Sequence, residues 1–123
     1  MNAINWFEIP AADFDRAVRF YQTVYHADLR VEACADDTPV AILPYDQQTG
    51  VGGSIVKGLN LQPNEAGVRI YLNGGQDLTV MLGRVNEAGG EIVMEKTKLP
   101  GDIGYIAQFR DSEGNVIGLH STH

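Results

Sequence analysis

The same order of secondary-structure elements is expected twice along this chain, and this duplication limits the possible folds more than any other feature. In each half, the pattern of apolar residues predicts a strand, an amphipathic helix and then three strands, over about residues 4–60 and 66–121. One such unit forms a small curled sheet with a helix on one face. Two units side by side predict a single α+β domain over residues 1–123, a curled mixed sheet whose inner faces line a cup, with the helices outside.

Each half is expected to contain one helix with a single apolar stripe. In the first half, apolar residues recur at three- and four-residue steps from about Asp13 to His26, and Asp13 is a candidate N-cap. In the second half, a helix is expected from about Asp77, and Gly89-Gly90 is typical of a left-handed helix end. The apolar stripe of this second helix comprises Leu78, Met81, Leu82, Val85 and Ala88.

Strand alternation predicts which residues line the cup. In the last strand, Ile117 and Leu119 share one face, and Gly118 and His120 share the other. Because the apolar face packs against a helix, the opposite face of each strand would line the cup. The residues expected there are Trp6, Glu8, Ser54, Val56, Arg69, Tyr71, Gly118 and His120. Tyr105 is a further candidate, although Tyr105 and Gln108 both face inward only if their strand contains a bulge.

Composition excludes several classes of partner. The net charge of −7 argues against binding to nucleic acid or to an anionic membrane, since both require a basic surface. No apolar run reaches membrane length, and the first residues lack the features of a signal peptide. The sole cysteine, Cys34, cannot form an internal disulfide, which indicates a cytoplasmic protein. We interpret Cys34 as structural, because no basic neighbour is evident to activate its thiol.

Two motifs connect the chain to a known group of proteins. The segment Asp-Phe-Asp-Arg-Ala at 13–17 leads to Phe20-Tyr21, and Asp111-x-x-Gly114-Asn115 leads to the last strand. In this order they resemble the vicinal oxygen chelate superfamily, which includes glyoxalase I, bleomycin- and fosfomycin-resistance proteins and extradiol dioxygenases. The opening Trp-Phe-Glu-Ile-Pro and the closing Gly-Leu-His-Ser are most similar to small bacterial glyoxalase-like proteins. The resemblance covers residues 4–120 and implies the fold, whereas one scaffold hosts many chemistries.

The resemblance also implies where a divalent metal would bind. Metal-binding members use inward His or Glu residues from the first and last strands of each half. The corresponding positions in this chain are Trp6, Ser54, Arg69 and Gly118, and none of them carries a good ligand. We therefore expect no metal cofactor and no metal-dependent glyoxalase activity. A shifted site at Glu8 and His120 is the remaining metal alternative, but two protein ligands are few for tight binding.

The cup-facing residues allow more than one function. Glu8 and His120 could form a hydrogen-bonded pair that either acts as general acid and base or simply holds two strands together. Trp6 could stack on a ligand or fill space. Arg69 could bind a carboxylate or phosphate, pair with Glu8, or face solvent at the sheet edge. Tyr71 and Tyr105 suit either a pocket or a core.

Three hypotheses follow for the chain as a whole. It binds a small molecule in the cup without metal, in a sequestration or resistance-like role, or it is a metal-independent lyase or isomerase that uses Glu8 and His120. In the third, the cup is filled by its own side chains and the chain is a stabilising or partner-binding domain. We also expect a homodimer, because the sheet edges need covering. The cup could then form within one chain or across two.

Overall fold

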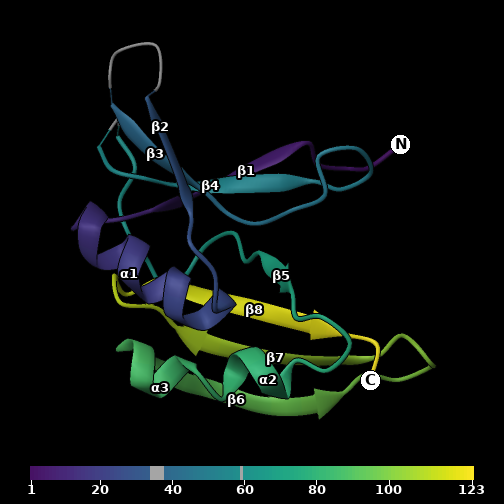
Figure 1. Cartoon of the computed structure of the whole chain (residues 1–123). Coiled ribbons are helices and arrows are strands. Elements are labelled where there is room, and N and C mark those ends of the chain that lie inside the picture. The colour runs from purple at the N-terminus through teal and green to yellow at the C-terminus, as the bar shows by residue number, and fades with distance from the viewer. Residues whose placement is uncertain (34–37, 59) are drawn as a thin grey trace.

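The computed structural model describes residues 1–33, 38–58 and 60–123, so Cys34 lies outside the described residues. The strands form two separate four-stranded sheets (Figure 1). The first sheet has the order β1-β4-β3-β2, with β1 (Trp6–Pro10), β2 (Arg30–Ala33), β3 (Pro39–Ile42) and β4 (Gly52–Val56). The second sheet has the order β5-β8-β7-β6, with β5 (Tyr71–Asn73), β6 (Glu91–Lys98), β7 (Tyr105–Arg110) and β8 (Val116–Ser121).

Both sheets are mixed and share one topology. The edge strand β1 pairs in parallel with β4, and β5 pairs in parallel with β8, whereas the other pairs are antiparallel. The predicted α+β fold built from two similar units is therefore confirmed. Because β1 and β5 each have a neighbour on one side only, both leave backbone groups free along their outer edge.

The first helix, α1 (Phe14–Tyr25), matches its sequence pattern closely. The carboxylate of Asp13 accepts a hydrogen bond from the backbone N–H of Arg16 at 3.1 Å, which caps the start of the helix. His26 ends it in the left-handed conformation, with φ of 56°. The predicted apolar stripe supplies the buried residues Ala17, Tyr21 and Val24, and Phe20 is buried beside them.

The single helix predicted for the second half is instead divided. Two short segments, α2 (Thr79–Leu82) and α3 (Val85–Ala88), are separated at Gly83 and Arg84. The N–H of Arg84 donates to the carbonyl of Met81, three residues back, so the chain tightens there. The apolar stripe is still buried along both segments, and Gly89 ends α3 in the left-handed conformation, as expected.

One hydrophobic core lies between the two sheets and includes α1. Ile55 comes from the first sheet, Leu119 from the second, and Phe20 of α1 packs against Phe109 of β7, with ring centroids 5.9 Å apart. Figure 1 shows that α1 lies between the two sheets. The helix-packing faces of both sheets are therefore directed toward the shared core. It follows that the opposite faces, which the sequence predicts to line a cup, point away from each other.

A buried polar cluster joins the two halves. The hydroxyl of Tyr21 in α1 donates to the carboxylate of Asp111 at 2.7 Å. Asn115 donates from its side chain both to Asp111, at 3.0 Å, and to the backbone carbonyl of Pro10, at 2.8 Å. Burial raises the pKa of Asp111, although these hydrogen bonds act in the opposite direction. The turn at 111–115 thus fixes the second half onto both α1 and β1.

A second contact of the same turn is more exposed. Glu113 accepts from the guanidinium of Arg16 at 2.8 and 3.1 Å and from the backbone N–H of Asp13 at 2.7 Å. Desolvation would raise the pKa of Glu113, but these hydrogen bonds outweigh it and lower that pKa.

In the described part of the chain, no helix is long and apolar enough to span a bilayer.

Candidate functional site

The cup face of the first sheet is largely aromatic and apolar. The β1–β4 register places Trp6 beside Gly52 and Glu8 beside Ser54. The indole Nε1–H of Trp6 donates to the hydroxyl of the buried Ser54 at 3.3 Å. Tyr45, from the loop before β4, meets the Trp6 ring edge-on at 5.8 Å and lies over Gly52, where a Cβ would overlap its ring. Trp6 remains 40% exposed, so its ring can still contact a ligand.

The predicted pairing of Glu8 with His120 is not formed within one chain. Among the described residues, no hydrogen bond or ion pair involves the carboxylate of Glu8, which is exposed. His120 Nε2 lies 2.7 Å from the backbone carbonyl of Ile103. Because a carbonyl only accepts, Nε2 carries the hydrogen. The two side chains belong to faces that point away from each other, and their predicted catalytic roles remain predictions.

A polar network crosses the cup face of the second sheet. The guanidinium of Arg69 donates to the amide oxygen of Gln108 at 3.1 Å and to the backbone carbonyl of Glu65 at 3.0 Å. The amide nitrogen of Gln108 then donates to the hydroxyl of Tyr71 at 3.0 Å. Gly118 lies beneath the Tyr71 ring, where a Cβ would overlap it. Arg69 and Tyr71 therefore lie on the predicted face, and Gln108 joins them.

The prediction that Tyr105 faces the cup is wrong. In the β7–β8 register, Tyr105 is opposite Ser121 and Gln108 is opposite Gly118, so strand alternation separates the two side chains. Tyr105 packs against the hydrophobic core, and the ammonium of Lys96 lies 4.4 Å from its ring centroid. The strand contains no bulge that would bring both residues to one face, since its pairing with β8 is continuous.

The two arginines on this face differ in their partners. Arg110 forms ion pairs with Glu65 at 2.7 Å and Glu91 at 2.9 Å, which compensate its charge. In contrast, no ion pair joins Arg69 to any carboxylate in the described part of the chain. Arg69 is half-buried and hydrogen-bonded only to neutral groups. It therefore contributes an uncompensated positive charge.

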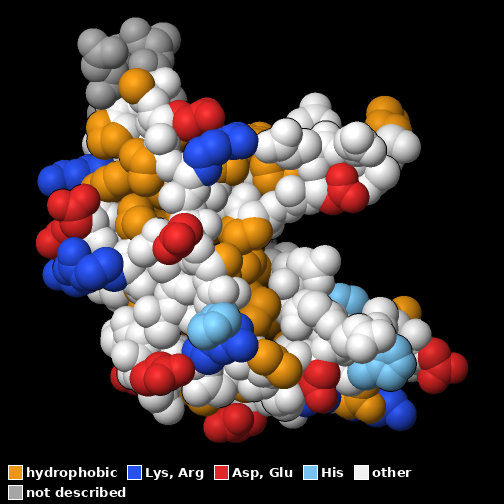
Figure 2. Space-filling view, in the orientation of Figure 1, with side chains coloured by type: hydrophobic (Ala, Val, Ile, Leu, Met, Phe, Trp, Pro, Cys, Tyr) orange, Lys and Arg blue, Asp and Glu red, His pale blue; other side chains and the backbone are white. Residues whose placement is uncertain are grey.

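A cleft of about 900 Å³ separates the two sheets, but it is not the predicted cup (Figure 2). Tyr25 of α1, Met81 of α2 and the core-facing Phe7 line it, so it lies on the helix sides of the sheets. Tyr71 on the edge strand β5 and Arg69, which precedes this strand, border it. The other predicted cup residues, Trp6, Glu8, Ser54 and His120, do not line it.

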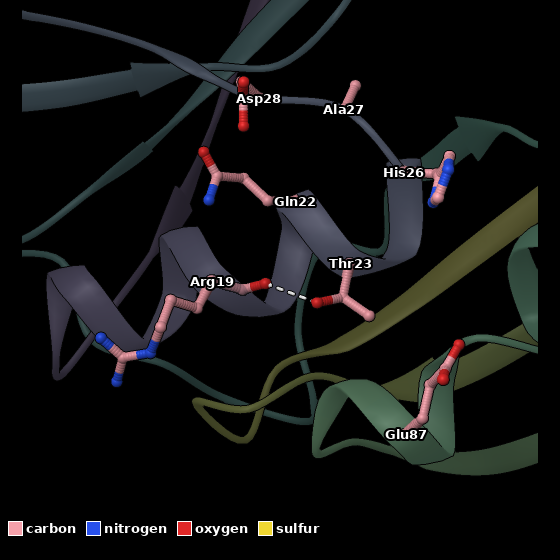
Figure 3. Close-up of a pocket in the computed structure, with 7 residues that line it drawn as sticks. All are labelled: Arg19, Gln22, Thr23, His26, Ala27, Asp28 and Glu87. Carbon is pink, nitrogen blue, oxygen red and sulfur yellow. Dashed lines mark hydrogen bonds between the residues drawn. The ribbon is translucent and has the colours of Figure 1, made fainter.

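A second depression lies beside α1, away from both cup faces (Figure 3). Its lining comprises Arg19, Gln22, Thr23, His26, Ala27, Asp28 and Glu87. The hydroxyl of Thr23 donates to the backbone carbonyl of Arg19 at 3.0 Å, and the Gln22 side chain accepts from the N–H of Leu29 at 3.0 Å. These bonds hold the end of α1 and the approach to β2. The depression is therefore a structural junction rather than part of the cup.

The residues at the metal positions implied by the resemblance do not fit a divalent ion. Trp6 uses its only polar atom to donate to Ser54, and the guanidinium of Arg69 is a cation bonded to Gln108. Gly118 has no side chain and is covered by the ring of Tyr71. Within residues 1–33, 38–58 and 60–123, no group of three or more His, Cys, Asp or Glu side chains is placed to hold a metal.

Solved structures match this fold along nearly the whole chain. A glyoxalase/bleomycin resistance protein from Albidiferax ferrireducens is 15% identical, with 98% of each chain covered and a TM-score of 0.76. Another from a Streptomyces species is 23% identical, with 96% of this chain and 100% of that chain covered and a TM-score of 0.72. The protein therefore has the glyoxalase/bleomycin resistance fold, which confirms the predicted resemblance at the level of fold. No family model matches the chain, and no curated protein matches it in sequence.

A third solved structure has a longer chain. A variant of glyoxalase I from Zea mays is 20% identical, with a TM-score of 0.68, and the match covers 96% of this chain but 46% of the maize chain. The chain described here thus spans about half the length of that protein. The maize chain has room for a second unit of the same size.

Proposed function

We propose that this protein binds a small molecule, without a metal ion, in a cup assembled from two copies of the chain. The observation that carries the proposal is the direction of the two cup faces, which point away from each other across a shared core. Each face alone is an open, curled half-cup. A second copy supplies the missing half to each face.

The free edges of the sheets support this arrangement. A two-fold axis at the mouth of the cleft brings β1 of one copy beside β5 of the other. The same axis brings β5 of the first copy beside β1 of the second. Each first sheet then lies next to the second sheet of the other copy, which makes two equivalent cups. The exposed apolar residues that border the cleft, such as Ile4 and Val68, become covered. The double length of the maize glyoxalase I chain is consistent with a functional unit of two such chains.

The residues of each cup suit binding rather than metal chemistry. The first sheet offers the rings of Trp6 and Tyr45 and the hydroxyl of Ser54. The second offers Arg69 and Tyr71, already held by Gln108. Preorganised aromatic and hydrogen-bonding groups of this kind are what a small-molecule site requires. The same positions lack metal donors, so we propose that the cup functions without a metal.

Light scattering with a matched pair of variants tests the assembly. The wild type is expected to have twice the mass of one chain. Val68→Asp places a charge at the cleft, where Val68 is 93% exposed in one chain, and should weaken the dimer at least about tenfold. Val93→Asp, on the far edge strand β6, where Val93 is 45% exposed, should leave the dimer intact. A wild-type monomer at working concentrations would contradict the proposal.

One observation favours a catalytic version of the same site. Glu8 has no partner in the described structure, and the Nδ1 atom of His120 has no hydrogen bond there, so both are available. In the two-copy cup, Glu8 of one copy and His120 of the other face one cavity. A metal-independent lyase or isomerase could use them for proton transfer on a small carbonyl or acid substrate. Glu8→Gln would then abolish turnover and leave ligand affinity nearly unchanged, whereas a pure binding protein shows no turnover to lose.

A further inference from the structure

The polar network on the second sheet is arranged around a glycine. Across the strands, Tyr71 of β5 is opposite Gly118 of β8, and Gly118 is opposite Gln108 of β7. The contact between Tyr71 and Gln108 therefore passes over Gly118, where any side chain would overlap the tyrosine ring. Arg69 reaches Gln108 from the same edge. The polar ends of Arg69 and Tyr71 thus meet above the middle of the sheet rather than at its free edge.

The hydrogen bonds of this network leave several donors unused. Gln108 donates to Tyr71, so the tyrosine oxygen accepts, and its own O–H has no acceptor among the described residues. Arg69 has five N–H donors, and its two recorded bonds go to neutral oxygens. Gln108 fixes both groups by using its amide oxygen for one and its amide nitrogen for the other. The site therefore presents a positive charge and free hydrogen-bond donors.

The charge of Arg69 is not compensated in the way that the charge of its neighbour Arg110 is. The chain contains 16 acidic and 9 basic residues, and the neighbouring Arg110 is paired with two carboxylates. Desolvation of an unpaired charge is costly, and the neutral oxygens bonded to Arg69 do not neutralise its charge. A ligand that brings its own negative charge removes that cost. A guanidinium binds a carboxylate or phosphate through two parallel hydrogen bonds.

We propose that Arg69 and Tyr71, oriented by Gln108, form an oxyanion-binding site, and that the small molecule bound in the cup carries a carboxylate, phosphate or phosphonate group. This inference rests on the proposed function and specifies its ligand class. The oxyanion lies against the second sheet of one copy. The apolar part of the ligand then faces Tyr45 and the exposed ring of Trp6 on the other copy.

Three probes that share a phenyl ring and differ in the charge of the attached group test the proposal on the full chain. Phenylphosphonate is anionic, benzyl alcohol is neutral and benzyltrimethylammonium is cationic, and each is titrated while the backbone amide signals are followed by NMR. Phenylphosphonate should bind most tightly and shift amide signals in β5, β7 and β8. Arg69→Gln should weaken its binding about tenfold or more, and Tyr71→Phe by a smaller factor. Arg69→Lys keeps the charge without the planar fork and should give an intermediate affinity.

A matched variant and the neutral and cationic probes decide between outcomes. Arg19→Gln makes the same charge change on α1, outside the cup, and should leave phenylphosphonate affinity unchanged. Thermal melts of each variant check that it is folded. Equal phenylphosphonate affinity of the wild type and Arg69→Gln would overturn the oxyanion site. Tighter binding of the neutral or cationic probe would overturn it as well. Either result would leave the proposed small-molecule cup in place. Failure of all three probes to perturb cup residues would overturn the proposed function as well.

Discussion

The two half-cups have the same architecture but carry opposite kinds of side chain. In each, the edge strand pairs in parallel with a strand that contains a glycine, and an aromatic ring lies over that glycine: Tyr45 over Gly52 and Tyr71 over Gly118. In the first sheet, the ring belongs to an apolar surface that includes the exposed Trp6. In the second, it belongs to a polar network.

This difference indicates a division of roles. The first half offers an aromatic surface with little charge apart from Glu8, and the second offers an oriented cation and hydroxyl. Neither half alone encloses a ligand, because each is open on the side where its own chain provides no covering sheet. In the cup that we propose, the two halves complement each other and come from different chains.

The largest expected effect comes from breaking the connection between the halves. Asp111→Ala removes the acceptor for the Tyr21 hydroxyl and for the backbone N–H groups of Glu113 and Asn115. Leaving these buried donors unsatisfied should cost about 3 kcal/mol of unfolding free energy. Urea titration followed by circular dichroism measures the loss. Asp102→Ala, at an exposed loop position, should change it by less than about 0.5 kcal/mol; equal effects would show that the buried cluster does not hold the halves together.

A pair of glycine substitutions sharpens the comparison of the two cup faces. Gly118→Ala and Gly52→Ala each add one methyl group beneath an aromatic ring, and each should cost about 1–3 kcal/mol through overpacking. Their effects on ligand binding should differ. Displacing Tyr71 breaks its bond to Gln108, so Gly118→Ala should reduce the preference for the anionic probe over the neutral one. Gly52→Ala should weaken binding of both probes alike. Identical binding profiles for the two variants would argue against the division of roles.

The smallest expected effect is a pH dependence confined to the second half. Hydrogen bonds from the hydroxyl and backbone N–H of Thr79, and then from Lys96, lower the pKa of Asp77 from 3.8 to about 2. A lowered carboxyl pKa contributes stability above the unfolded pKa, and this contribution is lost as the pH falls through about 2. Asp77→Asn keeps an oxygen acceptor but does not titrate there. Its melting temperature should therefore fall less than that of the wild type between about pH 4 and pH 2. Parallel curves would contradict this.

Local sequence patterns predicted the elements well where one interaction dominates. The stripe of α1 and the inward positions of Trp6, Arg69 and Tyr71 follow from periodicity, and the cap of α1 follows from the preference of Asp for an N-cap. The break between α2 and α3 does not, because the apolar stripe continues through it and only the tightened turn at Gly83 divides the helix.

The site was less predictable, because its decisive contacts are long-range. Whether Tyr105 or Gln108 faces the cup depends on the register of β7 against β8, which alternation within one strand cannot set. Tyr45 lies in a loop, and only the absence of a side chain at Gly52 could have suggested that a ring packs there. The separation of the two faces by α1 depends on how the halves pack, and no motif encodes it.

Mixing two defective variants tests most directly whether each cup is built from two chains. Trp6→Ala damages the first half-cup and Arg69→Gln the second, and each variant alone should bind phenylphosphonate weakly. When the two are refolded together, a mixed dimer contains one cup with both defects and one cup with neither. If each cup is built from two chains, about a quarter of all cups should recover wild-type affinity. If the mixture binds no better than the separate variants while mixed dimers are present, each cup lies within one chain, which contradicts a cup shared between two copies.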